Sequence, residues 1–207
     1  QALEKYQELQ QLAEQQQDNR MKLAALMALA TLRSTPNPAY HPQKAEELLE
    51  QALELARDLQ DRIAESKILW NLMLLKTFTS NDPQQAVSYG EQSLALAKSL
   101  NLREQVALTL NDLSLAYRNS GELERSQEVL EEASAMWRNT QNLPMLIDNL
   151  SRYAVGHFLL GHYEQAIASS EEAAQISESI GNISGLANSR LIVGHVFLEE
   201  GRPDKAI

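Results

Sequence analysis

The sequence predicts an all-α chain built as a solenoid of antiparallel helix hairpins. Residues that end helices recur with a fixed period, because Gly121, Gly161 and Gly201 are 40 positions apart. Aromatic residues make up only 5% of the chain, and the sequence has no runs of β-branched residues typical of strands. Such a period is the signature of an array whose units pack on their neighbours. Small residues keep it too, at intervals of 41, 40, 40 and 40: Ala45, Ala86, Ser126, Ala166 and Ala206.

The chain is expected to open with a single helix and then a longer repeat. Residues 1–18 match the second helix of a preceding repeat, because Leu12 and Asp18 correspond to Leu55 and Asp61 at an offset of 43. Residues 19–61 form the next repeat, and its loop at 34–42 holds three of the six prolines. Proline disfavours helix in the residue before it, so this loop should be extended. It is either a tolerated surface insertion or a binding loop or hinge.

Regular repeats are expected to follow at 62–101, 102–142 and 143–181, with a truncated repeat at 182–207. Asp82 and Pro83 supply a helix cap and a proline in the first helical turn. The whole chain should be one array, and a fragment of a longer protein with an effector domain elsewhere. First helices are expected at 62–79, 103–119, 144–160 and 183–200, and second helices at 83–100, 122–140 and 162–180.

Composition excludes several classes of function. A net charge of −10 with scattered basic residues argues against nucleic acid, and no apolar stretch is long enough to span a membrane. The chain has no cysteine, which suits a reducing compartment, so we expect a cytoplasmic location. His157 and His162 lie five positions apart across a turn, unlike a metal pair on one helical face. We therefore expect no enzyme activity, no cofactor and no metal site.

The residues of two repeats resemble the tetratricopeptide repeat. The resemblance rests on Leu110, Asn111, Leu113, Ser114 and Tyr117, followed by Gly121-Glu122-Leu123-Glu124 and Ser126, and on Leu150, Tyr153 and Ala154, followed by Gly161-His162-Tyr163-Glu164-Gln165-Ala166. The longer period is similar to the variety found in kinesin light chain and in the sensor arms of bacterial signalling ATPases and transcription activators. The resemblance implies a right-handed superhelix whose first helices line a concave groove.

That groove supplies the candidate binding residues. In peptide-binding relatives, an Asn fifteen positions before the small residue holds the backbone of an extended ligand, and Asn71 and Asn111 match that column. The alternative is an Asn tolerated on a partly wet surface. Neighbouring columns give the groove an apolar first half and a mixed second half. The predicted partner-binding residues are Asn71, Leu75, Asn111, Leu115, Arg118, Ser151, Phe158, Asn188 and His195.

The predicted function is a protein-binding or peptide-binding scaffold, or a sensor segment, of a larger signalling or regulatory protein. One alternative is a small-molecule-sensing arm that controls an attached ATPase, cyclase or transcription activator. A deep polar pocket around Asp148, Arg152, Asn188 and Arg190 would favour this alternative. Another is a structural spacer or self-assembly element that associates end to end through its terminal repeats.

Overall fold

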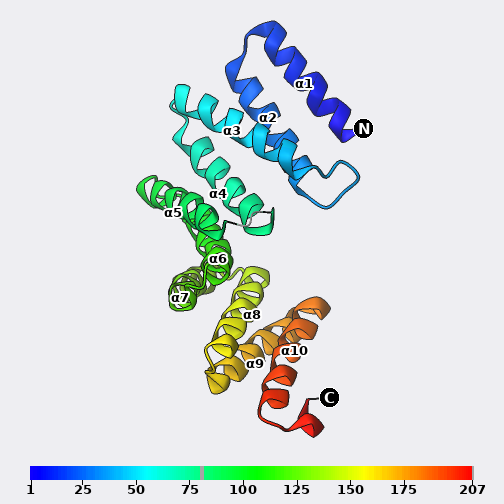
Figure 1. The fold of residues 1–207 in the computed structure, drawn as a ribbon, viewed down its shortest axis with the longest axis vertical. Coiled ribbons are helices and arrows are strands. Elements are labelled where there is room, and N and C mark those ends of the chain that lie inside the picture. The colour runs from blue at the N-terminus through cyan, green and yellow to red at the C-terminus, as the bar shows by residue number, and fades with distance from the viewer. Residues whose placement is uncertain (80–81, 207) are drawn as a thin grey trace. The chain divides into compact units, whose positions relative to one another are not determined.

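The computed structural model describes residues 1–79 and 82–206, which form ten α-helices and no strand. This confirms the all-α solenoid of helix hairpins, and the observed helices agree with the expected ones to within about one residue. A short 3₁₀ turn at Pro203–Lys205 follows the last helix (Figure 1). The helices are α1 Ala2–Gln16, α2 Asn19–Ser34, α3 Pro42–Asp58, α4 Arg62–Thr79, α5 Pro83–Ser99, α6 Arg103–Asn119, α7 Leu123–Thr140, α8 Leu143–Leu159, α9 Tyr163–Ile180 and α10 Ile183–Glu199.

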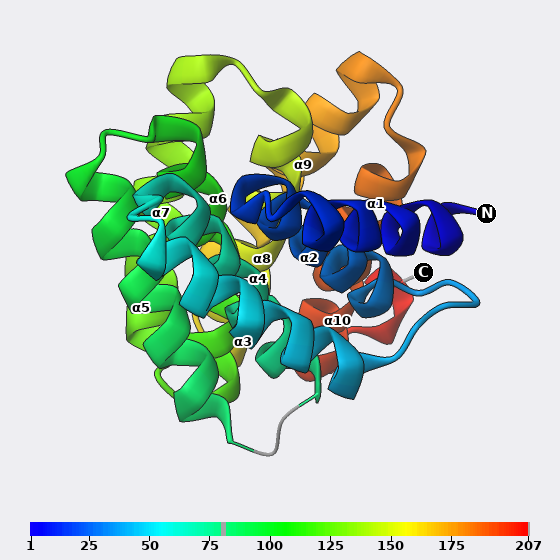
Figure 2. The same ribbon diagram turned by 90° about the horizontal axis from the view of Figure 1, so that it is seen from above.

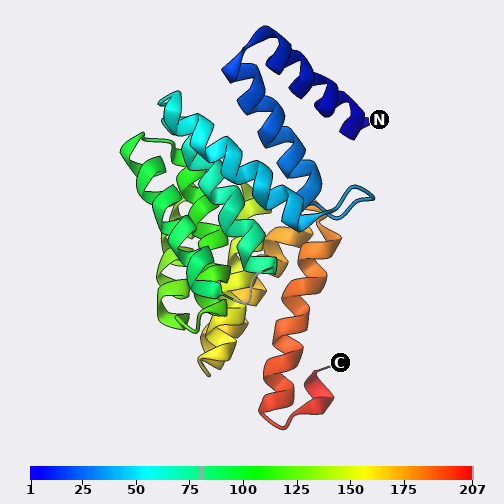
Figure 3. The ribbon, with the colours of Figure 1, turned by 45° about the horizontal axis from the view of Figure 1, so that its top comes forward.

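The chain divides into two compact units, residues 1–109 and residues 110–207, and the division falls inside α6. In the first unit each helix from α1 to α5 packs on the next, and α2 also contacts α4 (Figure 3). In the second unit α7, α8, α9 and α10 pack in succession, and α8 also contacts α10. The even-numbered helices are the first helices of the repeats, so neighbouring first helices touch within each unit.

The 40-residue period of small residues marks buried positions of the second helices. Ala45, Ala86 and Ala166 are completely buried, and Ser126 is 3% exposed. The Ser126 hydroxyl donates to the Ser114 carbonyl oxygen at 2.8 Å, so its burial leaves no polar group unpaired. Small side chains let two helices approach closely, and a larger side chain there would separate them. Large apolar residues such as Leu26, Leu49 and Leu72 fill the space around these contacts in the first unit.

Polar side chains cap the starts of several helices, and residues in the left-handed conformation end others. Asp18 accepts hydrogen bonds from the backbone N–H groups of Arg20 and Met21, and thereby caps α2. Asp82 caps α5 in front of Pro83, as predicted. Gly121 and Gly161 have φ values of 84° and 75°, the left-handed conformation that glycine adopts without strain. Asn81, which holds the repeat position of Gly121 and Gly161 and is therefore expected in a turn, lies outside the described residues.

The proline-rich loop is ordered by its own hydrogen bonds. Helix α2 continues to Ser34 and α3 starts at Pro42, so the irregular segment is shorter than predicted. The Asn37 amide donates to the Leu32 carbonyl oxygen at 2.8 Å and accepts from the Ala39 N–H at 2.7 Å. Arg33 donates to the Ala39 carbonyl oxygen at 3.1 Å. The loop projects beyond the ends of α2 and α3 (Figure 2) in a fixed shape.

None of the helices within the described parts of the chain combines the length and the apolar character needed to cross a membrane. Residues 1–79 and 82–206 also contain no group of three or more His, Asp or Glu side chains placed to hold a metal ion.

We predict that Gly185→Ala destabilises the second unit. A Cβ at Gly185 in α10 would lie 2.6 Å from the Ser177 hydroxyl oxygen and 2.7 Å from Cγ2 of Ile147, and both residues are buried. We expect a loss of about 1–2 kcal/mol, because overpacking outweighs the better helix propensity of alanine. Urea unfolding measures it, with the exposed neighbour Ser184→Ala as the control. An unchanged midpoint for Gly185→Ala would show that α10 packs less closely on α8 and α9.

Candidate functional site

One face of the second unit combines partly buried side chains of α8 with exposed side chains of α10. Helix α8 contributes Ser151, Val155 and Phe158, and α10 contributes Asn188, Leu191, His195 and Leu198. Spacings of three and four positions place each set on one side of its helix. We call this surface the α8–α10 face.

The two helices meet on this face through an aromatic contact. The Phe158 and His195 rings are 6.1 Å apart between centroids, in an edge-on arrangement. Leu191 and Leu198 expose 59% and 55% of their surfaces, although large apolar side chains are usually buried. The α8–α10 face therefore combines an aromatic pair with flanking leucines that are open to solvent.

Helix α6 joins this face through a buried amide network. The Asn111 amide nitrogen donates to Asp148 Oδ2 at 2.8 Å, and its oxygen accepts from the Asn149 amide at 3.0 Å. Asn149 also donates to the Leu130 carbonyl oxygen at 3.1 Å. Asn111 is only 1% exposed. Both sides of its amide are thus engaged within the protein, and its observed role is to tie α6 to α8.

Of the four residues suggested for a small-molecule pocket, the two arginines pair with different carboxylates. Arg152 donates from Nε to Asp148 Oδ2 at 2.8 Å, and its NH2 lies 3.5 Å from Asp112 Oδ1. Arg190 pairs instead with Glu178 on α9 at 3.0 Å. Asn188 is exposed on α10. The structure therefore shows two separate ion pairs at these positions.

Arg118 lies one turn after Leu115 on α6, and both side chains are partly buried. Burial, and secondly the nearby Arg152 guanidinium, lower the pKa of Arg118 from its usual value. No hydrogen bond or ion pair joins the Arg118 guanidinium to any residue that the structure describes. Ser151, another predicted binding residue of the second unit, donates a hydrogen bond from its hydroxyl to the Ile147 carbonyl oxygen of its own helix.

The other predicted residues belong to the first unit. Leu75 is buried, whereas Asn71 is partly exposed and its amide donates to the Lys67 carbonyl oxygen at 3.0 Å. Both line a cavity of about 400 Å³ between α2, the proline-rich loop and α4. Tyr40 and Phe78 also line it and are 48% and 72% exposed. Sequence reasoning missed Tyr40, because the loop has no counterpart in the other repeats.

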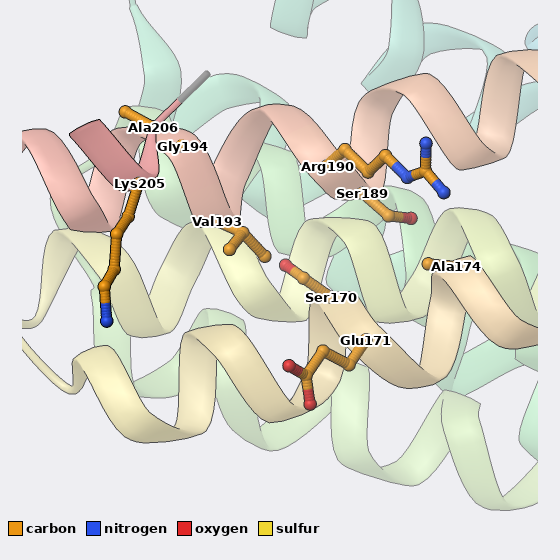
Figure 4. A pocket seen from close by; sticks show the side chains of 9 residues that line it. All are labelled: Ser170, Glu171, Ala174, Ser189, Arg190, Val193, Gly194, Lys205 and Ala206. Atoms are coloured by element: carbon orange, nitrogen blue, oxygen red, sulfur yellow. The ribbon is translucent and has the colours of Figure 1, made fainter. Parts of the chain in front are cut away.

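A second cavity, of about 440 Å³, lies beside α9, α10 and the 3₁₀ turn (Figure 4). A Cβ at Gly194 would be 3.1 Å from the Ala206 carbonyl oxygen, so the chain passes close to α10 here. The repeat period equates Gly194 with Ala154 and Ala206 with Ala166, and both of those alanines are completely buried. The cavity therefore corresponds to the place where α9 packs on α8, one repeat earlier. Its lining residues are Ser170, Glu171, Ala174, Ser189, Arg190, Val193, Gly194, Lys205 and Ala206.

The His157 side chain of α8 packs against other aromatic rings of the second unit. The His157 ring packs edge-on against Tyr153 with centroids 4.5 Å apart, and it lies 5.7 Å from the His162 ring. Burial, followed by the charge of His162, lowers the pKa of His157 below its usual value. The neutral imidazole is therefore the form that the folded chain favours.

Comparisons with known proteins agree with this architecture. Residues 106–140, which run from α6 to the end of α7, match the tetratricopeptide repeat family. No curated protein sequence matches the chain significantly. These matched residues are a tetratricopeptide repeat, and the array as a whole has the fold of that class of helical-repeat proteins.

Three solved structures illustrate the similarity. BtubC (BKLC) from P. vanneervenii has a TM-score of 0.81 at 21% identity, covering 100% of this chain and 87% of that one. The signal transduction ATPase with a tetratricopeptide repeat sensor from Pyrococcus horikoshii has a TM-score of 0.77 at 18% identity, covering 91% of this chain and 29% of that one. A Rap protein complexed with competence and sporulation factor has a TM-score of 0.73 at 16% identity, covering 90% and 51%. At these identities the likeness concerns the fold.

We predict that the two column asparagines respond differently to truncation. Asn111→Ala removes a donor from Asp148 and an acceptor from Asn149, so it should lower stability by about 1–3 kcal/mol. Asn71→Ala removes only a bond within its own helix and should change stability by no more than about 0.5 kcal/mol. Urea unfolding followed by circular dichroism compares the two variants. Equal losses would contradict the structural role of Asn111.

We also predict that stability falls as the solution is acidified below the usual histidine pKa. Because the pKa of His157 is lower in the folded state, the unfolded chain takes up this proton first. The contribution of His157 is therefore complete above the usual histidine pKa of 6.5 and is lost as the pH falls toward the folded pKa. His157→Gln should reduce the change of the unfolding midpoint with pH between about pH 7 and pH 5. His195→Gln, at an exposed position of α10, is the control, and equal slopes for His157→Gln and the unmodified chain would refute the assignment.

Proposed function

We propose that the α8–α10 face binds an extended segment of a protein partner. The observation that carries the proposal is the pair of leucines, Leu191 and Leu198, each more than half exposed beside the Phe158–His195 contact. Exposed apolar clusters on a folded surface are typical of interaction sites. A row of side chains across parallel first helices suits an extended chain, which presents side chains at regular intervals.

The face is held in place before any ligand arrives. Val196 of α10 and Ala154 of α8 are completely buried beneath it, and the Asn111 network fixes α6 against α8. A rigid receptor gives up little conformational entropy on binding. The similarity to the Rap protein solved with competence and sporulation factor supports a binding role for an array of this fold.

A sensor role within a larger signalling protein is the second candidate. It is supported by the similarity to the Pyrococcus horikoshii ATPase, whose repeats are described as a sensor and of which this chain covers 29%. On this proposal the bound segment, or another ligand, would be the signal. The absence of cysteine suits a reducing site of action such as the cytoplasm.

Peptide selection tests the binding face. Random twelve-residue peptides displayed on phage would be selected on the purified 207-residue chain, and synthetic copies of the enriched peptides measured by fluorescence polarisation. The double variant Leu191→Ser and Leu198→Ser should weaken binding at least about tenfold, because each leucine contributes about 1.5–3 kcal/mol when buried.

The matched control is Leu159→Ser with Ile180→Ser, which changes two exposed apolar residues of the same unit that lie off the face. We expect this control to bind as tightly as the unmodified chain. Equal affinities for both double variants would place the binding surface elsewhere, and a selection without enriched peptides would refute the peptide-binding function.

A further inference from the structure

Arg118 differs from every other arginine of the second unit in its charge pairing. Among the described residues of this unit, the other arginines each have a carboxylate partner. These pairs are Arg125 with Glu122, Arg138 with Glu172, Arg152 with Asp148, Arg190 with Glu178 and Arg202 with Glu200. Arg118 has none, although the chain carries a net charge of −10 and has carboxylates in excess.

The unpaired guanidinium is also one of the less exposed ones. Arg118 is only partly exposed, whereas Arg138 and Arg190 are exposed and paired. Burial removes water from a charge, so a partly buried cation normally gains a carboxylate in compensation. Arg118 therefore retains an unmet requirement for an anion within the folded chain.

The carboxylates of Asp112 and Asp148 already have partners within the protein. Asp148 accepts from both Arg152 and Asn111, and Asp112 lies against Arg152. Moving either aspartate to Arg118 would break the network that ties α6 to α8. A carboxylate from a bound ligand would complete the pairing and leave this network intact.

Arg118 extends the α8–α10 face by one helix. It holds on α6 the repeat position that Phe158 holds on α8 and Leu198 holds on α10. Packed helices are about 8–10 Å apart, and an extended chain advances about 3.3 Å per residue. A segment crossing this face would thus place successive contacting side chains about three residues apart.

We propose that Arg118 binds an acidic side chain of the partner segment, about three residues from an apolar side chain that packs on Phe158 and His195. This inference rests on the proposed peptide-binding function and names the chemistry of its ligand. The carboxylate would receive a charge-assisted bond from a guanidinium that pairs with no carboxylate in the free protein. The apolar side chain would cover the ring contact and the adjacent leucines.

The peptides enriched on the purified chain test this arrangement. We expect a shared Asp or Glu about three positions from an apolar residue. Arg118→Gln should weaken these peptides about tenfold to a hundredfold, the range for a hydrogen bond to a charged group. Added salt should weaken binding to the unmodified chain more than binding to Arg118→Gln. The unfolding midpoint of Arg118→Gln should not fall, because the substitution removes no internal ion pair.

Control variants separate the outcomes. Arg138→Gln, which removes a paired arginine from α7, should keep full affinity. Arg118→Glu should regain binding to a peptide whose acidic residue is replaced by Lys. Full affinity in Arg118→Gln, with affinity lost in the Leu191→Ser and Leu198→Ser variant, would overturn the acidic site and leave the binding face standing. Enriched peptides without an acidic residue would overturn it as well.

Discussion

The close approach of helices at small residues is the constraint on which the rest of the structure depends. Ala45, Ala86 and Ala166 are completely buried where second helices meet their neighbours. A side chain larger than alanine at these points would force the helices apart or displace the packed leucines around them. Because the contact recurs every 40 or so residues, each unit repeats one local geometry. Within each unit, neighbouring first helices are thereby held in contact.

Several buried polar side chains of the second unit are hydrogen-bonded across its helices. Ser126 replaces alanine in the small-residue column and bonds to the Ser114 carbonyl oxygen. Asn111 donates to Asp148 and accepts from Asn149. These bonds favour one arrangement of α6 and α8, because a shift between the two helices would break them. The network therefore orients α6 against α8 and holds the surface that bears Arg118.

The fold could be predicted from the sequence because residue patterns that repeat along the chain specify where each helix begins and ends. Gly121 and Gly161 end first helices, and Asp82 with Pro83 starts a second helix, so each hairpin could be placed from its own residues. The site was less accessible to prediction. Asn71 and Asn111 share a column, but one bonds within its own helix and the other across helices to Asp148. That difference depends on residues 37 positions apart in sequence, and no spacing rule reveals it. The lack of a partner for Arg118 is likewise visible only when all neighbouring carboxylates have been placed.

An acidic ligand for an acidic chain requires that local electrostatics prevail over the net charge. The charge of −10 is spread over the whole chain, and salt at physiological strength screens exposed charges beyond about 8 Å. Arg118 is partly buried beside Arg152, so its interaction with a carboxylate at contact distance is screened much less. Long-range repulsion would then slow the approach of an acidic segment, whereas the desolvated pair would slow its departure. Such a surface rejects acidic chains that lack the matching apolar side chain, because charge alone does not draw them in. Selectivity therefore comes from the combination of one unpaired cation and the exposed apolar row next to it.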